Sequence, residues 1–364
     1  MKILCICPIG IGNYLLMYPA CAALKKKLPE SELHLLALRG AIRELAADDP
    51  LWKGMHLIDP TRNPSLIMQA AFVRRLWRER YDLSLAFFPS NTWQYNLLPY
   101  ISGVKVRHAF GYPLKQGSSL SFLNTRHIQI NPDVHDINQN FRLVSACVGE
   151  RVGGEPVEFP SLWGASERSE ADALLHSYGA PARFIGIHPG SSGEHGMASK
   201  RWDPMRFGHL AERICAELGA QALVFGGKDE EKIKHVTASV LREPCHIIEP
   251  CHLRKTAALL SRCTLLLCND SGLMHMAAGI GTPVAAIFGP TDEKRNGPWG
   301  ERHLVIRKPM AGFPLWTAAT AGDRASSSGV DPAASLRALS VDDAWDMLGP
   351  WLARLEIQAR TAGR

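Results

Sequence analysis

Short apolar runs alternate with segments of helical length along the whole of this 364-residue chain. The runs at 2–7, 83–88 and 184–187 are long enough for one strand each. They lack the alternation of apolar and polar residues that is typical of a strand with one solvent-exposed face. A strand that is buried on both faces is typical of a parallel sheet covered by helices. The alternation therefore predicts an α/β protein built on parallel sheets.

The predicted strands fall into two sets, separated by a glycine-rich break at 149–156. The first set comprises 2–7, 33–37, 56–59 and 83–88, and the second 184–187, 221–225, 246–248, 264–268 and 284–288. Helices are predicted over 14–28, 41–47, 65–79, 92–101, 135–148 and 166–178, and an irregular Ala-, Ser- and Gly-rich loop over 317–335. We therefore predict two Rossmann-like domains facing each other across a cleft, at 1–160 and 180–335, with a closing helix at 341–358.

Composition limits the class of protein. Hydrophobic residues at 46% and charged residues at 21% are typical of a soluble globular chain. The net charge of +6 fits an enzyme of anionic substrates and is too small to argue for nucleic acid. The nine scattered cysteines suit reduced thiols, and no apolar run approaches the roughly 18 residues of a membrane span. We expect a cytoplasmic protein.

A polar turn and a helix follow the predicted strand 264–268. Asp270 or Ser271 can cap that helix, and Gly272 lets a ligand approach the backbone. The free amides of the first turn favour an anion such as a diphosphate, and His275 lies within reach of the same ligand. The alternative is that Asp270 and Ser271 only cap a core helix and that His275 is a surface imidazole.

A second polar loop follows the predicted strand 184–187. The hydroxyls of Ser191 and Ser192 can bond phosphate oxygens, and Lys200 can neutralise a leaving diphosphate. A turn with a solvated lysine is the alternative. After strand 221–225, Asp229 is a candidate acid for the ribose hydroxyls of a nucleotide, although a helix start favours acids in any case.

The turn at Gly10 and Gly12 lacks the third glycine and the distal acid of a dinucleotide fingerprint, which argues against an NAD-dependent oxidoreductase. Its physical use is to bring the backbone close to a substrate.

The segment 269–292 resembles the donor-binding segment of the heptosyltransferases, glycosyltransferase family 9, and Lys200-Arg201-Trp202-Asp203-Pro204 matches the family's Lys-x-Trp-x-Pro. The resemblance implies a GT-B fold and inverting, metal-independent transfer of a sugar, in the first instance heptose from ADP-heptose, to a lipopolysaccharide-core, other saccharide or lipid-linked acceptor. No cofactor and no nucleic-acid partner is implied. The implied donor-binding residues are Gly12, Ser191, Ser192, Lys200, Asp229, Asp270, Ser271, Gly272 and His275.

The chain departs from the family at one position. Where relatives carry an aspartate thought to act as the general base, this chain has Asn13, which has no titratable carboxylate. We take Asn13 and Lys200 as the candidate catalytic residues, with Asn13 orienting the acceptor hydroxyl. The departure also supports an alternative function, that of a non-catalytic nucleotide-sugar-binding protein.

The acceptor side and a membrane contact are the remaining expectations. Arg62, His135 and Arg142 fall where relatives contact the acceptor, although helix capping and a solvated helix face explain them as well. A basic helix face with two aromatic residues could touch the inner membrane surface, and an ordinary charged helix face is the alternative. That face comprises Arg74, Arg75, Arg78 and Arg80, with Phe72 and Trp77.

Overall fold

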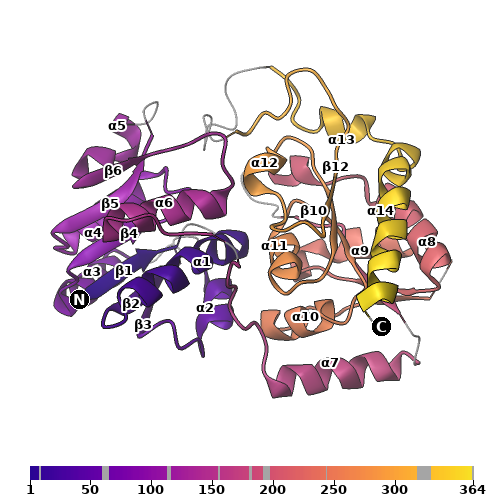
Figure 1. Cartoon of the computed structure of the whole chain (residues 1–364), viewed down its shortest axis with the longest axis horizontal. Coiled ribbons are helices and arrows are strands. Elements are labelled where there is room, and N and C mark those ends of the chain that lie inside the picture. Colours follow the sequence, from indigo (N-terminus) through magenta and orange to yellow (C-terminus); the bar gives the residue numbers. More distant parts are fainter. Residues whose placement is uncertain are drawn as a thin grey trace. The chain divides into compact units, whose positions relative to one another are not determined.

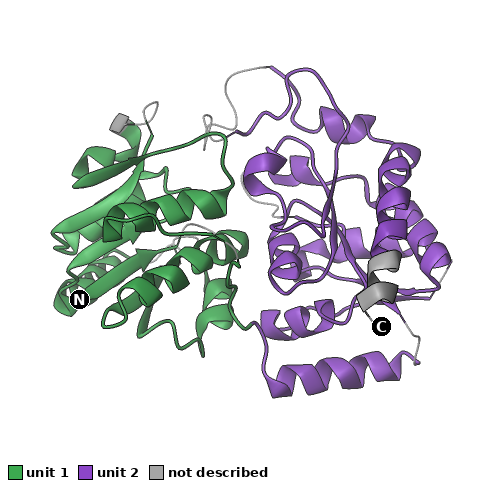
Figure 2. Ribbon diagram, in the orientation of Figure 1, with its two compact units in different colours: residues 1–161 green, residues 162–364 purple. Residues whose placement is uncertain are grey.

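The chain divides into two compact units, residues 1–161 and 162–364, which are coloured separately in Figure 2. The structure, a computed structural model, describes residues 1–7, 10–59, 65–112, 116–154, 156–179, 183–191, 197–242, 244–317 and 329–362, without the side chains of 116, 117 and 356–362. Each unit is built on one parallel six-stranded sheet with helices on both faces, as the sequence predicts.

The sheet of unit 1 has the strand order β3-β2-β1-β4-β5-β6 (Figure 1). Its strands are β1 (Lys2–Ile6), β2 (Glu32–Ala37), β3 (Gly54–Leu57), β4 (Leu83–Ala86), β5 (Val106–Gly111) and β6 (Arg126–Gln129). Strands β5 and β6 were not predicted, because polar residues such as Arg107, His108 and His127 interrupt their apolar runs. The strand predicted at 56–59 begins two residues earlier.

Helices cover both faces of this sheet. They are α1 (Ile11–Lys27), α2 (Gly40–Ala46), α3 (Leu66–Glu79), α4 (Trp93–Ile101), α5 (Gln116–Ser119) and α6 (Asp136–Val148), with a 3-10 turn, η3, at Ser121–Leu123. Helix α1 packs against α6, and α3 packs against α4. Because side chains alternate along a strand, Leu4 and Ile6 of β1 lie on one face, where they join Leu76 of α3 in the core.

The sheet of unit 2 has the strand order β12-β11-β10-β7-β8-β9, which repeats the topology of unit 1. Its strands are β7 (Phe184–His188), β8 (Gln221–Val224), β9 (Cys245–Ile247), β10 (Leu266–Asn269), β11 (Val284–Ile287) and β12 (Leu304–Ile306). In both sheets the first strand pairs with the second on one side and the fourth on the other. The strand order therefore reverses beside β1 in unit 1 and beside β7 in unit 2, where open α/β sheets bind ligands.

The helices of unit 2 include the predicted linker helix and the predicted closing helix. They are α7 (Ala165–Ser177), α8 (Pro204–Leu218), α9 (Glu231–Ala238), α10 (Leu253–Leu260), α11 (Gly272–Gly279), α12 (Glu293–Asn296), α13 (Ala334–Ala338) and α14 (Val341–Ala362), with 3-10 turns η4 at Met197–Lys200 and η5 at Lys228–Glu230. Helix α13 begins inside the segment predicted as irregular, and residues 318–328 of that segment lie outside the described residues.

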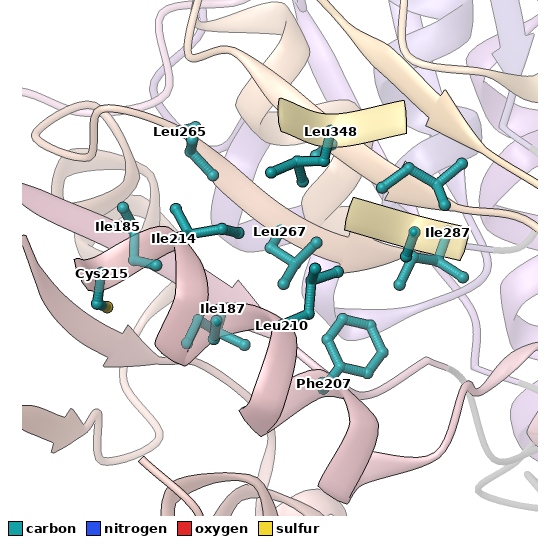
Figure 3. Packing of buried hydrophobic residues seen from close by; sticks show 14 of the residues in the cluster. Ile185, Ile187, Phe207, Leu210, Ile214, Cys215, Leu265, Leu267, Ile287 and Leu348 are labelled. Atoms are coloured by element: carbon teal, nitrogen blue, oxygen red, sulfur yellow. The ribbon is translucent and has the colours of Figure 1, made fainter. Parts of the chain in front are cut away.

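The core of unit 2 shows what the apolar residues of β7 contact. Ile185 and Ile187 point to the face covered by α8 and α14, where they meet Phe207, Leu210 and Leu348 (Figure 3). Each fully buried aliphatic or aromatic side chain of this kind contributes about 1.5–3 kcal/mol. Helix α8 is fixed at its start by Asp203, whose carboxylate accepts hydrogen bonds from the amides of Met205 and Arg206.

Within the described residues, none of the helices is both long and apolar enough to cross a membrane.

Unit 1 buries a polar network beneath α3. The Tyr81 hydroxyl lies 3.0 Å from Nδ1 of His34 and 2.6 Å from Nε2 of His56. Burial is the main cause that lowers the pKa of His56 to about 4, and the positive charge of Arg75 is the second cause. Burial, and then the charge of Lys2, also lowers the pKa of His34. Both imidazoles are therefore held neutral at pH 7.

We predict that this network makes unit 1 acid-labile. The unfolded chain takes up protons on His56 near pH 6.5 and the folded chain only near pH 4, so stability falls as the pH drops through that window. His56 alone contributes roughly 3 kcal/mol to this loss. Urea unfolding followed from pH 7 to pH 4 should show a shallower pH dependence in His56→Gln than in the wild type. His176→Gln, at an exposed histidine of α7, is the control; equal slopes for all three proteins would contradict the prediction.

Candidate functional site

The candidate site of unit 2 lies at the carboxyl ends of β7 and β10, which are neighbours in the sheet. His188, the last residue of β7, pairs with Cys268 of β10, so the segments that follow the two strands start side by side. The segment after β10 is Asp270-Ser271, which leads directly into α11. The order of the strands reverses between β7 and β10, and the site occupies this switch point.

Helix α11 presents its amino end to this site. Ser271 is the N-cap residue, and its Oγ accepts a hydrogen bond from the amide of Met274 at 3.4 Å. The other amides of the first turn have no partner within the helix, so they favour an anion. His275 lies in the same turn and is buried.

A buried ion pair stands beside the helix. The Nζ of Lys200 lies 2.5 Å from Oδ2 of Asp270, and Oδ1 of Asp270 accepts a hydrogen bond from Nδ2 of Asn296 at 3.0 Å. Burial would raise the pKa of the Asp270 carboxyl, but the charge and hydrogen bond of Lys200 hold it below its ordinary value. The carboxylate is therefore ionised at neutral pH, and Lys200 is the cation that pairs with it.

His188 links the helix to a second carboxylate. Its Nδ1 lies 3.0 Å from Oγ of Ser271, and its Nε2 lies 3.3 Å from Oε2 of Glu230. The same Glu230 oxygen accepts a hydrogen bond from the amide of Gly227 at 2.8 Å. Burial would raise the pKa of Glu230, but its contacts with His188, the Gly227 amide and Arg201 together hold that pKa below its ordinary value. A Cβ on Gly190 would lie 1.9 Å from Oε1 of Glu230, so a side chain at this position would displace the Glu230 carboxylate.

The loop after β7 is held in place by polar side chains. Asn269 donates from Nδ2 to the carbonyl oxygen of Pro189 at 2.7 Å and accepts from the amide of Trp202 at 3.0 Å. The Oγ of Ser191 donates to the carbonyl oxygen of Asp270 at 3.2 Å. Nε of Arg201 donates to the carbonyl oxygen of Ser191 at 3.0 Å. These bonds place two cations, Lys200 and Arg201, next to the amino end of α11.

The structure thus brings six of the predicted donor-binding residues to one edge of one sheet. They are Ser191, Lys200, Asp270, Ser271, Gly272 and His275. Ser192 lies outside the described residues, as does Arg62 of the predicted acceptor set. Asp229 is exposed, whereas the next residue, Glu230, is buried in the site.

His188, Arg201 and Asn296 were not predicted as site residues, and of the two neighbouring acids Asp229 was predicted in place of Glu230. Glu230 had a usable signal, because an acid three residues after Gly227 has the spacing of a capping box, in which the carboxylate turns back to the N-cap amide. Asn296 had none, since its partner Asp270 is 26 positions away in the sequence.

The predicted residues of unit 1 lie near its own switch point or on α6. Gly12 and Asn13 lie in the first turn of α1, which follows Gly10 at a φ of 107°. Gly12 therefore belongs to unit 1, whereas the other donor-binding candidates belong to unit 2. Asn140 of α6 fixes the adjoining backbone, since it accepts from the amide of Phe88 at 2.9 Å and donates to the carbonyl oxygen of Leu16 at 3.0 Å.

Helix α6 carries the other two acceptor candidates. His135 is its N-cap residue and accepts through Nδ1 from the amide of Ile137 at 3.2 Å. Arg142, two turns further on, donates to Oε1 of Gln139 at 3.0 Å. Both side chains are half-buried.

We predict that Lys200 and Asp270 are energetically coupled. Lys200→Ala leaves Asp270 buried without its cation and should lower the free energy of unfolding by about 3–5 kcal/mol. The double variant Lys200→Ala/Asp270→Asn removes the stranded charge as well, so it should be more stable than Lys200→Ala alone. Urea unfolding of the four proteins of this cycle measures the coupling.

Lys228→Ala, at an exposed lysine of the same unit, is the control and should change stability by less than about 0.5 kcal/mol. Additive effects of the two site substitutions would contradict the coupling.

Comparison with known proteins assigns the family. Glycosyltransferase family 9 (heptosyltransferase) matches residues 69–313. Lipopolysaccharide heptosyltransferase 2 of Salmonella typhimurium is 26% identical over 325 residues, which span 84% of this chain and 88% of that protein. Lipooligosaccharide heptosyltransferase 2 of Haemophilus influenzae is 36% identical over 128 residues, only 34% of this chain and 36% of that protein.

A solved structure has the same fold. The E. coli ADP-heptose lipopolysaccharide heptosyltransferase II superposes with a TM-score of 0.72 at 20% identity, covering 98% of this chain and 100% of that one. This likeness confirms the predicted GT-B type fold with two Rossmann-like units. Together with the match over 69–313, it shows that the chain belongs to glycosyltransferase family 9, the heptosyltransferases.

Proposed function

We propose that this chain transfers heptose from ADP-heptose to a saccharide acceptor of the lipopolysaccharide core. The observation that carries the proposal is the pairing of Lys200 with Asp270 beside the amino end of α11, at the switch point of unit 2. The relatives support the choice of sugar and nucleotide, since one is named a lipopolysaccharide heptosyltransferase and another an ADP-heptose transferase.

The donor diphosphate binds, in this proposal, between the first turn of α11 and Lys200. The amides near Ser271 and Gly272 donate to one phosphate, and the Lys200 ammonium pairs with the other. Asp270 holds the ammonium in place before the donor arrives. Glu230 is better placed than the exposed Asp229 to accept hydrogen bonds from the ribose hydroxyls, because its carboxylate already lies inside the site.

The reaction is a displacement at the anomeric carbon. The acceptor hydroxyl oxygen forms a bond to that carbon on the face opposite the diphosphate, the carbon–oxygen bond to the β-phosphate breaks, and its electron pair leaves with ADP. The configuration therefore inverts. Lys200 and the α11 amides stabilise the charge that develops on ADP, a task that a divalent metal performs in other enzymes.

The acceptor hydroxyl must also lose its proton. Asn13 cannot take it, so we assign Asn13 to orienting the hydroxyl, with Arg62, His135 and Arg142 as acceptor-binding residues. Water or another group of unit 1 receives the proton; Asp133, His135 and Asp136 are the first candidates. The alternative function is a nucleotide-sugar-binding protein without transfer activity, and the one observation that favours it is the amide at position 13.

We predict that Lys200→Ala weakens ADP binding by roughly 1.5–3 kcal/mol, the scale of a hydrogen bond to a charged group. Calorimetric titration of folded protein with ADP measures this, with Arg168→Ala, at an exposed cation of α7 outside the site, as the control that keeps wild-type affinity. An unchanged affinity in Lys200→Ala would remove Lys200 from the diphosphate site.

We also predict that Asn13→Asp raises the rate of heptose transfer, because a well-placed general base adds about 10²–10⁴-fold. The release of ADP in the presence of donor and acceptor gives the rate, and the proposal expects the same rate in EDTA as in magnesium.

Asn140→Asp is not a suitable control, because Asn140 holds the adjoining backbone; Asn91→Asp, after β4, is used instead. A loss of activity in Asn13→Asp would mean that another base already serves the wild type. If neither form transfers sugar from a donor that binds, the binding-protein function replaces the transferase.

A further inference from the structure

The outer side of α3 in unit 1 is apolar where a helix on a soluble protein is normally polar. Leu66, Ala70, Val73 and Trp77 recur at spacings of four, three and four residues, so they form one stripe along the helix. Only Leu76 of α3 is buried, while Leu66 is 82% and Trp77 is 57% exposed. The stripe is therefore separate from the part of α3 that enters the core.

Helix α4 packs against α3 (Figure 1) and extends this apolar surface. Tyr100 and Ile101 at its end are 51% and 45% exposed. Ile101 and residues of the α3 stripe line a shallow hollow of about 540 Å³. A Cβ on Gly103, just after α4, would lie 3.0 Å from Cδ1 of Trp77, so the glycine allows the indole to lie against this turn. We call Leu66, Ala70, Val73, Trp77, Tyr100 and Ile101 the α3–α4 face.

Positive charge surrounds the α3–α4 face. Arg74, Arg75, Arg78 and Arg80 of α3 and its C-cap are exposed, and so is Lys105. Arg107 lies over the Tyr100 ring, with its guanidinium carbon 5.3 Å from the ring centroid. Two nearby acids already have partners: Glu79 pairs with Nζ of Lys2 at 2.8 Å, and Asp82 accepts from the Lys2 amide at 2.7 Å.

We infer that the α3–α4 face docks on the surface of an anionic lipid bilayer. Tryptophan and tyrosine favour the boundary between head groups and acyl chains, and arginine side chains are attracted to the negative surface potential of an anionic leaflet. A contiguous apolar patch within a basic rim has both features. The inference extends the proposed function, because a lipid-linked acceptor lies in such a surface, but the docking itself needs neither donor nor acceptor.

The test is flotation of the full chain with vesicles of phosphatidylcholine alone and of phosphatidylcholine with phosphatidylglycerol, without donor or acceptor. We expect binding to the anionic vesicles, and weaker binding in high salt. Trp77→Ser/Ile101→Ser and Arg74→Glu/Arg78→Glu should each lower the partition coefficient at least tenfold. The controls are Met205→Ser/Val330→Ser and Arg168→Glu/Lys232→Glu, at exposed positions of unit 2, and both should bind as the wild type does.

Three outcomes would overturn the inference. They are absence of the wild type from the anionic vesicles, equal losses in the face variants and the controls, and a dimer in sedimentation equilibrium that the face variants dissociate. The last outcome would make the face a contact between two copies of the chain. Heptose transfer to an acceptor without acyl chains should be unchanged in the face variants, so failure of docking is distinguishable from failure of the proposed reaction.

Discussion

The parallel pairing of β7 with β10 is the constraint on which the site depends. In a parallel pair the two carboxyl ends meet at one edge, so the loop after His188 and the turn at Asp270-Ser271 start next to each other although about 80 residues separate them in the sequence. The bond from Ser191 to the Asp270 carbonyl and the contact of His188 with Ser271 span these two segments, and His188 also ties a third segment, at Glu230, to them. The chemistry is thus a consequence of strand order.

Two buried carboxylates organise this edge in different ways. Asp270 faces Lys200 and keeps a cation at the mouth of the site, whereas Glu230 accepts from the Gly227 amide and faces His188. Removing such charges from water costs several kcal/mol, and the cost is offset only because each carboxylate has close partners. A site that holds paired charges before its ligand arrives needs little rearrangement when a diphosphate binds.

Unit 1 has the same strand order and a different chemistry. Beside β1 lies the first turn of α1, which contains Asn13 and has no side-chain cap. Beside β4, Asn140 forms hydrogen bonds to the backbone of Phe88 and Leu16. Its exposed helices also carry the apolar and basic α3–α4 face. An amide at position 13, a backbone hydrogen-bonded to Asn140 and an apolar surface with a basic rim suit a unit that positions an acceptor.

The sequence by itself determined the class of fold, the family and most of the residues around α11. Apolar runs of strand length and the Asp270-Ser271-Gly272 turn depend on local periodicity and capping, which neighbouring residues decide. The tertiary structure alone decided that Glu230 and not Asp229 turns inward, that His188 joins Ser271 to Glu230, and that β5 and β6 are strands in spite of their polar residues. These outcomes depend on which segments the sheet brings together, because contacts between residues far apart in the sequence, from about 20 positions for β5 and β6 to 83 for His188 and Ser271, leave no periodic trace in the chain.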